Sequence, residues 1–110
     1  MVRELEVNGK PLRIVATAPW NEAYGGLEGQ LYISLALTAL ARHPVDMLVF
    51  EEEGGTLAVR SAGYDLATDS VLDEKTVILR AESLPLRKFW LKLDDYGDSY
   101  VGTFLFPEDW

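Results

Sequence analysis

Residues 30–42 read Gln-Leu-Tyr-Ile-Ser-Leu-Ala-Leu-Thr-Ala-Leu-Ala-Arg, and this segment fits two periodicities. Apolar residues alternate from Leu31 to Ala39, as they do in a half-buried strand. Polar residues also recur at every fourth position, which would align them along one narrow stripe of a helix. Because alanine and leucine dominate the remainder and His43-Pro44 follows where a helix would stop, we predict one helix over about residues 28–42. The alternative, a strand here, would make the fold all-β.

The segments around this helix carry strand patterns. Residues 3–7 and 12–17 flank Asn8-Gly9, a pair that favours the positive φ angles of a tight hairpin turn. A second hairpin is predicted around Gly54-Gly55. Its strands would be residues 45–53 and 56–62, and residues 63–74 would form a polar connection to further strands at 76–81, 87–94 and 100–106.

These segments predict about seven strands and one helix. A helix that is apolar on most of its surface must lie against a sheet or a partner chain. We therefore expect an α+β, β-rich fold, with an antiparallel sheet or a partly closed barrel and the helix packed on it. No repeat or linker divides the chain, so residues 1–110 are expected to form a single domain.

The composition limits the chemistry that the chain can perform. It has one histidine, no cysteine, and 18 acidic against 10 basic residues, for a net charge of −8. Disulfides and thiolate chemistry are impossible, and a charge of this sign repels phosphates, so direct nucleic-acid binding is not expected. We predict no enzyme activity, no catalytic or metal-binding residue and no cofactor.

The chain also carries features that bear on its location. Its charged N-terminus is unlike a signal peptide, and its longest weakly polar stretch, residues 31–41, is too short to span a bilayer. A soluble cytoplasmic protein without membrane contact is therefore expected. The scarcity of Asn and Gln, with more Arg than Lys, is also typical of a thermophilic source.

Two segments expected to be loops could form binding sites, but each can also be explained by its structural role alone. Residues 20–29 hold three glycines and two large aromatic residues, but they lack a phosphate-binding motif, so a mobile covering loop or a ligand-contacting loop is expected. Asp94, Asp95 and Asp98 surround Gly97, and carboxylates there would suit a hard cation. A plain β-turn explains the same residues, because turns favour Asp and Gly.

The favoured hypothesis is a non-enzymatic protein-interaction module that acts as a homo-oligomer or binds another protein. The partner-binding residues predicted for it are aromatic: Trp20, Tyr24, Trp90, Phe106 and Trp110. One alternative is an acidic inhibitor or nucleic-acid mimic that binds a basic partner through residues 51–53, 94–98 and 108–109. The other is a small-ligand-binding or weakly catalytic sheet with a pocket under residues 20–29.

Overall fold

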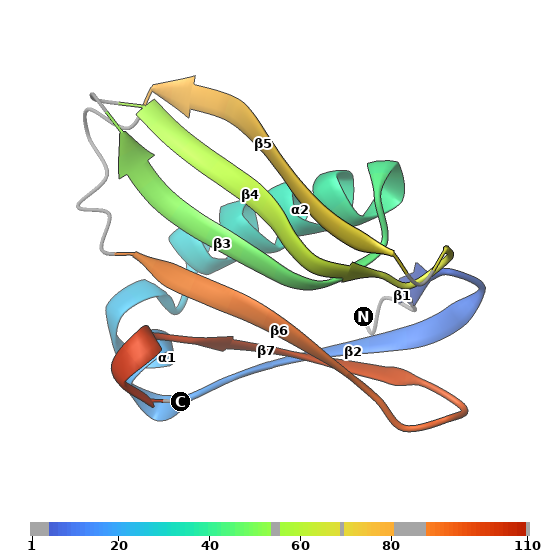
Figure 1. The fold of residues 1–110 in the computed structure, drawn as a ribbon. Helices are drawn as coiled ribbons and strands as arrows, with labels where there is room; N and C mark the ends of the chain where they lie inside the picture. The colour runs from blue at the N-terminus through green and yellow to red at the C-terminus, as the bar shows by residue number, and fades with distance from the viewer. Residues whose placement is uncertain (1–4, 54–55, 69, 81–87, 110) are drawn as a thin grey trace.

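The computed structural model describes residues 5–53, 56–68, 70–80 and 88–109 (Figure 1). The elements follow in the order β1 (Leu5–Val7), β2 (Lys10–Ala16), α1 (Ala18–Tyr24), α2 (Leu27–Arg42), β3 (Val45–Glu53), β4 (Thr56–Asp65), β5 (Val71–Arg80), β6 (Phe89–Asp95), β7 (Tyr100–Leu105) and the 3₁₀ helix η1 (Pro107–Asp109). The predicted β-rich α+β fold is confirmed.

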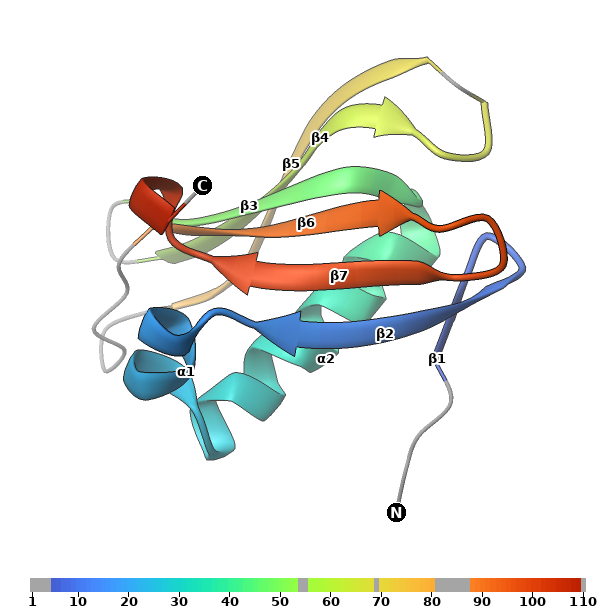
Figure 2. The same ribbon diagram turned by 90° about the horizontal axis from the view of Figure 1, so that it is seen from below.

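The seven strands form one sheet in the order β1-β2-β7-β6-β3-β4-β5. Every neighbouring pair is antiparallel except β2 and β7, which run parallel. The sheet twists strongly and curls into a half-barrel, and α2 crosses one of its faces (Figures 1 and 2). The single parallel pair arises because the chain leaves β2 through α1 and α2 and returns to it only with its last strand.

Local signals in the sequence account for the first hairpin. Asn8 and Gly9 have φ angles of 53° and 79°, the left-handed conformation that this two-residue turn requires. The turn sets the register, with Leu5 opposite Leu12. Thus the hairpin predicted around Asn8-Gly9 is present, although β1 contributes only three residues that the structure describes.

The segment with two periodicities is a helix, as predicted. Tyr32, Ala36 and Leu40 recur at helical spacing and are buried, whereas Ser34 and Thr38 face solvent. The helix ends where the backbone N–H of His43 donates to the carbonyl of Ala39. The all-β alternative is therefore excluded.

The structure differs from the prediction in two places. Residues 18–24 form a second helix, α1, where a mobile loop was one expectation. The polar connection predicted over residues 63–74 is much shorter, because β4 continues to Asp65 and β5 already begins at Val71. The side chain of Asp65 accepts hydrogen bonds from the backbone N–H groups of Ala67 and Thr68, which closes this tight turn.

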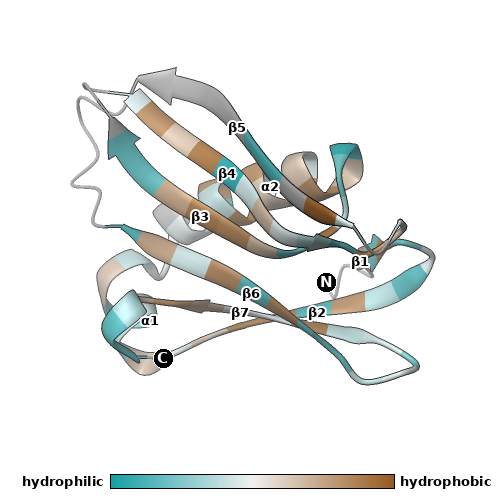
Figure 3. Ribbon diagram, in the orientation of Figure 1, coloured by the Kyte–Doolittle hydropathy of each residue, from teal (hydrophilic) through white to brown (hydrophobic). Residues whose placement is uncertain are grey.

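An aromatic cluster forms the centre of the core. From Phe89 to Leu93, buried and half-buried residues alternate along β6, and the hydropathy along the strand alternates with them (Figure 3). Phe89 stacks on Phe50 of β3, with ring centroids 4.7 Å apart, and lies 5.0 Å from the ring of Tyr32 on α2. Phe104 of β7 stacks on Trp20 of α1 at 4.4 Å. These contacts join both helices to the middle of the sheet.

None of the helices in the described part of the chain is long and apolar enough to cross a membrane.

Candidate interaction surfaces

Within the described residues, the sheet has an uncovered edge at each end. At one end, β1 pairs only with Lys10 to Leu12, so no described strand covers the outer edge of residues 13–16 in β2. At the other end, no described strand pairs with the outer edge of β5 along its ten residues. Uncovered edges carry unpaired backbone N–H and C=O groups, which makes them templates for another strand.

The backbone of β2 has a defined orientation at its open edge. The N–H of Thr17 donates to the carbonyl of Phe104 in β7 over 2.9 Å, so this residue points toward the sheet. Successive residues of a strand point their polar groups in opposite directions. It follows that Ile14 and Ala16 direct their N–H and C=O groups to the open side, where a further strand would lie.

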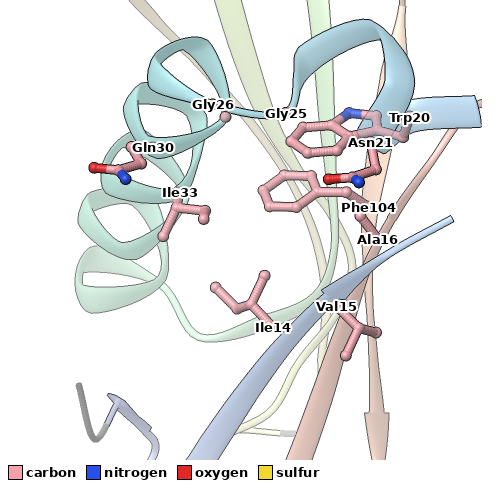
Figure 4. Close-up of a pocket in the computed structure, with 11 residues that line it drawn as sticks. Ile14, Val15, Ala16, Trp20, Asn21, Gly25, Gly26, Gln30, Ile33 and Phe104 are labelled. Carbon is pink, nitrogen blue, oxygen red and sulfur yellow. The ribbon is translucent and has the colours of Figure 1, made fainter. Parts of the chain in front are cut away.

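A cavity of about 320 Å³ lies beside this edge, between β2 and the two helices (Figure 4). Ile14 of β2 and Ile33 of α2 lie on opposite sides of it, and the stacked rings of Trp20 and Phe104 lie at one end. The remaining lining residues are Val15, Ala16, Asn21, Gly25, Gly26, Gly29 and Gln30. The cavity is partly open to solvent, so a bound group could enter along the edge of the sheet.

The glycines of residues 20–29 serve the packing of the helices. A Cβ atom on Gly29 would lie 2.6 Å from the carbonyl oxygen of Tyr24, so only glycine permits α2 to approach α1 this closely. Gly26 has a φ angle of 104°, which favours glycine in the link between the helices. A Cβ atom on Gly25 would lie 2.5 Å from the carbonyl oxygen of Asn21, so all three glycines are explained without a bound phosphate.

The described lining of the cavity is neutral and mixes polar and apolar groups. Among its described residues none is ionisable, and the polar side chains are the amides of Asn21 and Gln30. The indole Nε1 of Trp20 is buried and has no hydrogen-bond partner among the described residues. Such a lining offers no general acid, general base or nucleophile. It suits an apolar group whose polar atoms reach the amides at the rim.

The second open edge begins beside an exposed apolar pair. Tyr64 of β4 lies opposite Val71 of β5, and their side chains are 54% and 75% exposed. The N–H of Asp65 donates to the carbonyl of Ser70, so residues 65 and 70 form a hydrogen-bonded pair. Because such pairs alternate along an antiparallel ladder, Val71 and Asp73 direct their N–H groups to the open edge.

Three of the four large exposed hydrophobic side chains in the described chain lie near these two edges. The four are Val15, Tyr64, Val71 and Tyr96. Val15 lies on the open part of β2, and Tyr64 with Val71 borders the edge of β5, whereas Tyr96 lies in the turn between β6 and β7. Exposed apolar groups beside unpaired strands are typical of surfaces that bind another chain.

The aromatic residues predicted to bind a partner occupy different places. Trp20, Tyr24 and Phe106 are 3%, 4% and 1% exposed and pack within the core of one chain. Trp90 is half-buried between Val49 and Leu105, on the sheet face opposite the helices. Trp110 lies outside the described residues. Phe106 therefore packs onto the core of its own domain.

The acidic segments lie at opposite ends of β6. Residues 51–53 end β3 and lie near the beginning of β6. Residues 108–109 lie near the same place, because they follow the end of β7, which pairs with the beginning of β6. Residues 94–98 lie at the far end of β6, roughly 20 Å away at the usual rise of a strand. One face that unites all three segments is therefore not formed.

Several of these carboxylates already have basic partners. Asp95 lies 2.8 Å from the ammonium of Lys10, and this hydrogen bond lowers the pKa of Asp95 and raises that of Lys10. Asp95 also accepts a hydrogen bond from the N–H of Gly97, whose φ angle is 86°, as in an ordinary turn. In the described residues no group of three histidine or acidic side chains could hold a metal ion.

The single histidine has a structural contact. Its Nε2 lies 2.7 Å from the carboxylate of Glu74, and Arg42 lies 3.3 Å from the same group. Arg42 is the last residue of α2 and His43 follows it, while Glu74 belongs to β5. His43 thus connects the end of the helix to the edge strand and lies away from the cavity lining.

Comparison of the chain with protein-family models, with curated protein sequences and with solved structures gives no match.

Proposed function

We propose that this protein is a non-enzymatic protein-interaction module that acts as a homo-oligomer, in which two copies join through their β5 edges. The observation that carries the proposal is the ten-residue outer edge of β5, which no described strand covers and which the exposed pair Tyr64 and Val71 flanks. Two such edges pair antiparallel about a two-fold axis, the commonest symmetry of soluble dimers. The pairing would satisfy outward N–H groups such as that of Asp73.

A binding role rather than catalysis is also supported by the chemistry of the cavity. Its described lining has no ionisable group, and the one histidine is paired with Glu74 on another part of the molecule. Proton transfer and nucleophilic attack both need such a group at the reacting atoms. The absence of cysteine fits a reducing cytoplasm, where we place the protein.

The separation of the acidic segments argues against an acidic inhibitor or nucleic-acid mimic. Such a protein would present its carboxylates as one continuous face to a basic partner. Here the segments divide between two ends of β6, and Glu51 and Asp95 are each within ion-pair distance of a basic residue of the same chain. The protein-interaction proposal needs no such convergence.

The proposal is tested by the mass in solution of the wild type and of two variants at one position. Asp73→Pro removes an N–H that points to the open edge, whereas Asp73→Ala keeps it and removes the same carboxylate. We expect wild type and Asp73→Ala to have twice the 12.3 kDa chain mass by size-exclusion chromatography with light scattering at low and high salt. Asp73→Pro should be monomeric.

A second pair of variants tests the exposed apolar pair with matched chemistry. Tyr64→Lys places a charge beside the proposed interface, and Tyr96→Lys places it on the distant turn, where the side chain is 69% exposed. Only Tyr64→Lys should weaken the dimer, and both variants reduce the net negative charge equally. A wild-type monomer at all concentrations, or a dimer unaffected by both Asp73→Pro and Tyr64→Lys, would overturn the proposal.

A further inference from the structure

We propose that the side of α2 that faces β5 completes the dimer interface, by packing against the same side of α2 in a second copy. This inference rests on the proposed β5 pairing and adds a side-chain contact to it. The surface consists of Leu31, Leu35, Thr38 and Arg42, which we call the α2 flank. Their spacings of four, three and four residues align them along one side of the helix.

The α2 flank points toward the edge of β5 that no described strand covers. Arg42 lies 3.3 Å from the carboxylate of Glu74 on β5, and His43, the residue after the helix, lies 2.7 Å from the same group. Ile33 is about two and a half turns before Arg42, so it lies on the opposite side of the helix, where it lines the cavity beside β2. The helix thus crosses one face of the sheet and ends beside β5 (Figure 1).

The chemistry of α2 suits contact with another chain. No residue from Gly29 to Ala41 is charged, although 25% of the residues in the whole chain are. Leu31 and Leu35 are only half-buried. The hydroxyl of Thr38 donates to the carbonyl of Ser34 over 3.0 Å, so Thr38 can be covered without losing a hydrogen bond. An apolar, uncharged and partly exposed helix side gains stability when another surface covers it.

The symmetry of the proposed dimer brings two such flanks together. Antiparallel pairing of two β5 strands about a two-fold axis forms one continuous sheet, with both α2 helices on the same face. Each α2 ends beside its own β5, where Arg42 contacts Glu74. The two helices would therefore run antiparallel on either side of the axis, with their flanks toward one another. A two-fold axis requires such a contact between identical surfaces.

Electrostatics also favours a contact through α2. Two copies that each carry a net charge of −8 repel one another on average. The uncharged stretch from Gly29 to Ala41 would let them meet without placing carboxylates against one another, and Glu74 is already paired with Arg42 of the same chain. A strand edge alone accepts many other strands, whereas the α2 flank adds side chains that select a second copy.

Matched substitutions on the two sides of α2 test this contact. Leu35→Glu places a carboxylate in the α2 flank, and Leu37→Glu makes the same exchange at a half-buried residue on the side of Ile33. Leu35→Glu should raise the dimer Kd at least tenfold in light scattering over a dilution series, because each dimer contains the substitution twice. Leu37→Glu should leave the Kd within about twofold of the wild-type value. Circular dichroism and urea unfolding confirm that both variants are folded.

A distance measurement tests the same contact without removing an apolar residue. The chain has no cysteine, so Thr38→Cys places a single spin label on the α2 flank of each copy. Pulsed electron paramagnetic resonance should give an inter-label distance of at most about 20 Å, two helix diameters. The control, Tyr96→Cys, labels the turn between β6 and β7 and should give a longer distance. Loss of the dimer on labelling Thr38→Cys but not Tyr96→Cys would also support the contact.

The outcomes separate this inference from the proposed function. A wild-type monomer at all concentrations overturns both, as does a dimer that survives Asp73→Pro and Tyr64→Lys. A dimer that Asp73→Pro abolishes but Leu35→Glu leaves intact retains the β5 pairing and overturns the helix contact. Labels at Thr38→Cys that lie farther apart than two helix diameters, or equal weakening by Leu35→Glu and Leu37→Glu, overturn the helix contact in the same way.

Discussion

Replacing Gly29 by alanine tests the reasoning on helix packing, because two opposing effects act at this residue. Gly29 lies in the first two turns of α2, and alanine stabilises a helix interior by about 1 kcal/mol relative to glycine. The added Cβ, however, would lie 2.6 Å from the backbone oxygen of Tyr24, where an ordinary contact is at least 3.4 Å. The helices must separate by several tenths of an ångström to accept it.

The cost of that separation should exceed the gain in helix propensity. The obstructing atom is backbone and cannot rotate away, and the shift would disturb Trp20, whose ring would lie 3.6 Å from the new methyl group. Overpacking of this kind costs about 1–3 kcal/mol. A net loss of about 1 kcal/mol is therefore expected, which lowers the urea midpoint of a domain of this size by roughly 0.5 M.

Urea unfolding monitored by circular dichroism measures this difference. Ser34→Ala is the control on the same helix, because Ser34 is exposed and its change adds helix propensity without a new neighbour. Its midpoint should rise slightly while that of Gly29→Ala falls. A Gly29→Ala midpoint equal to or above that of the wild type would refute the close approach of α1 and α2.

Three further predictions follow from individual contacts. Asp95→Asn removes the charge that pairs with Lys10. Because the pKa of Asp95 is lowered from 3.8, the variant should be less stable than the wild type at neutral pH, and this difference should vanish as the pH falls through the lowered pKa. A pH series of thermal melts measures the difference. Gly9→Ala strains a φ angle of 79° with no steric neighbour, so it should cost about 1 kcal/mol and lower the Tm by about 4–8 °C. Phe104→Ala removes a fully buried ring that stacks on Trp20 and should cost about 3–5 kcal/mol in urea unfolding, with loss of near-ultraviolet dichroism.

Local sequence patterns predicted the elements whose stability is also local. The Asn8-Gly9 turn needs only its own φ angles, and α2 is marked by Tyr32, Ala36 and Leu40 on one face and its end before Pro44. By contrast, α1 has only seven residues and would be unstable alone. It depends on Trp20 and Tyr24, which pack against β6 and β7, strands far away in the sequence.

The open edges could not be predicted because they depend on strand order. The pattern of β5 does not show that it ends the strand order, because that depends on which strands the rest of the described chain places beside β4. The position of the cavity lies near the one predicted, since one alternative placed a pocket under residues 20–29. Its lining, however, combines residues from β2, both helices and β7, a combination that no single segment reveals.

The outer edge of β5 suits a second copy of the same strand. This edge is ten residues long and no described strand pairs with it, so pairing along its length supplies the contact. The β5 strand of a second copy can pair along the whole edge, because a two-fold axis places the donors of each strand opposite the acceptors of the other. Self-association at β5 would also protect a long edge from unregulated pairing.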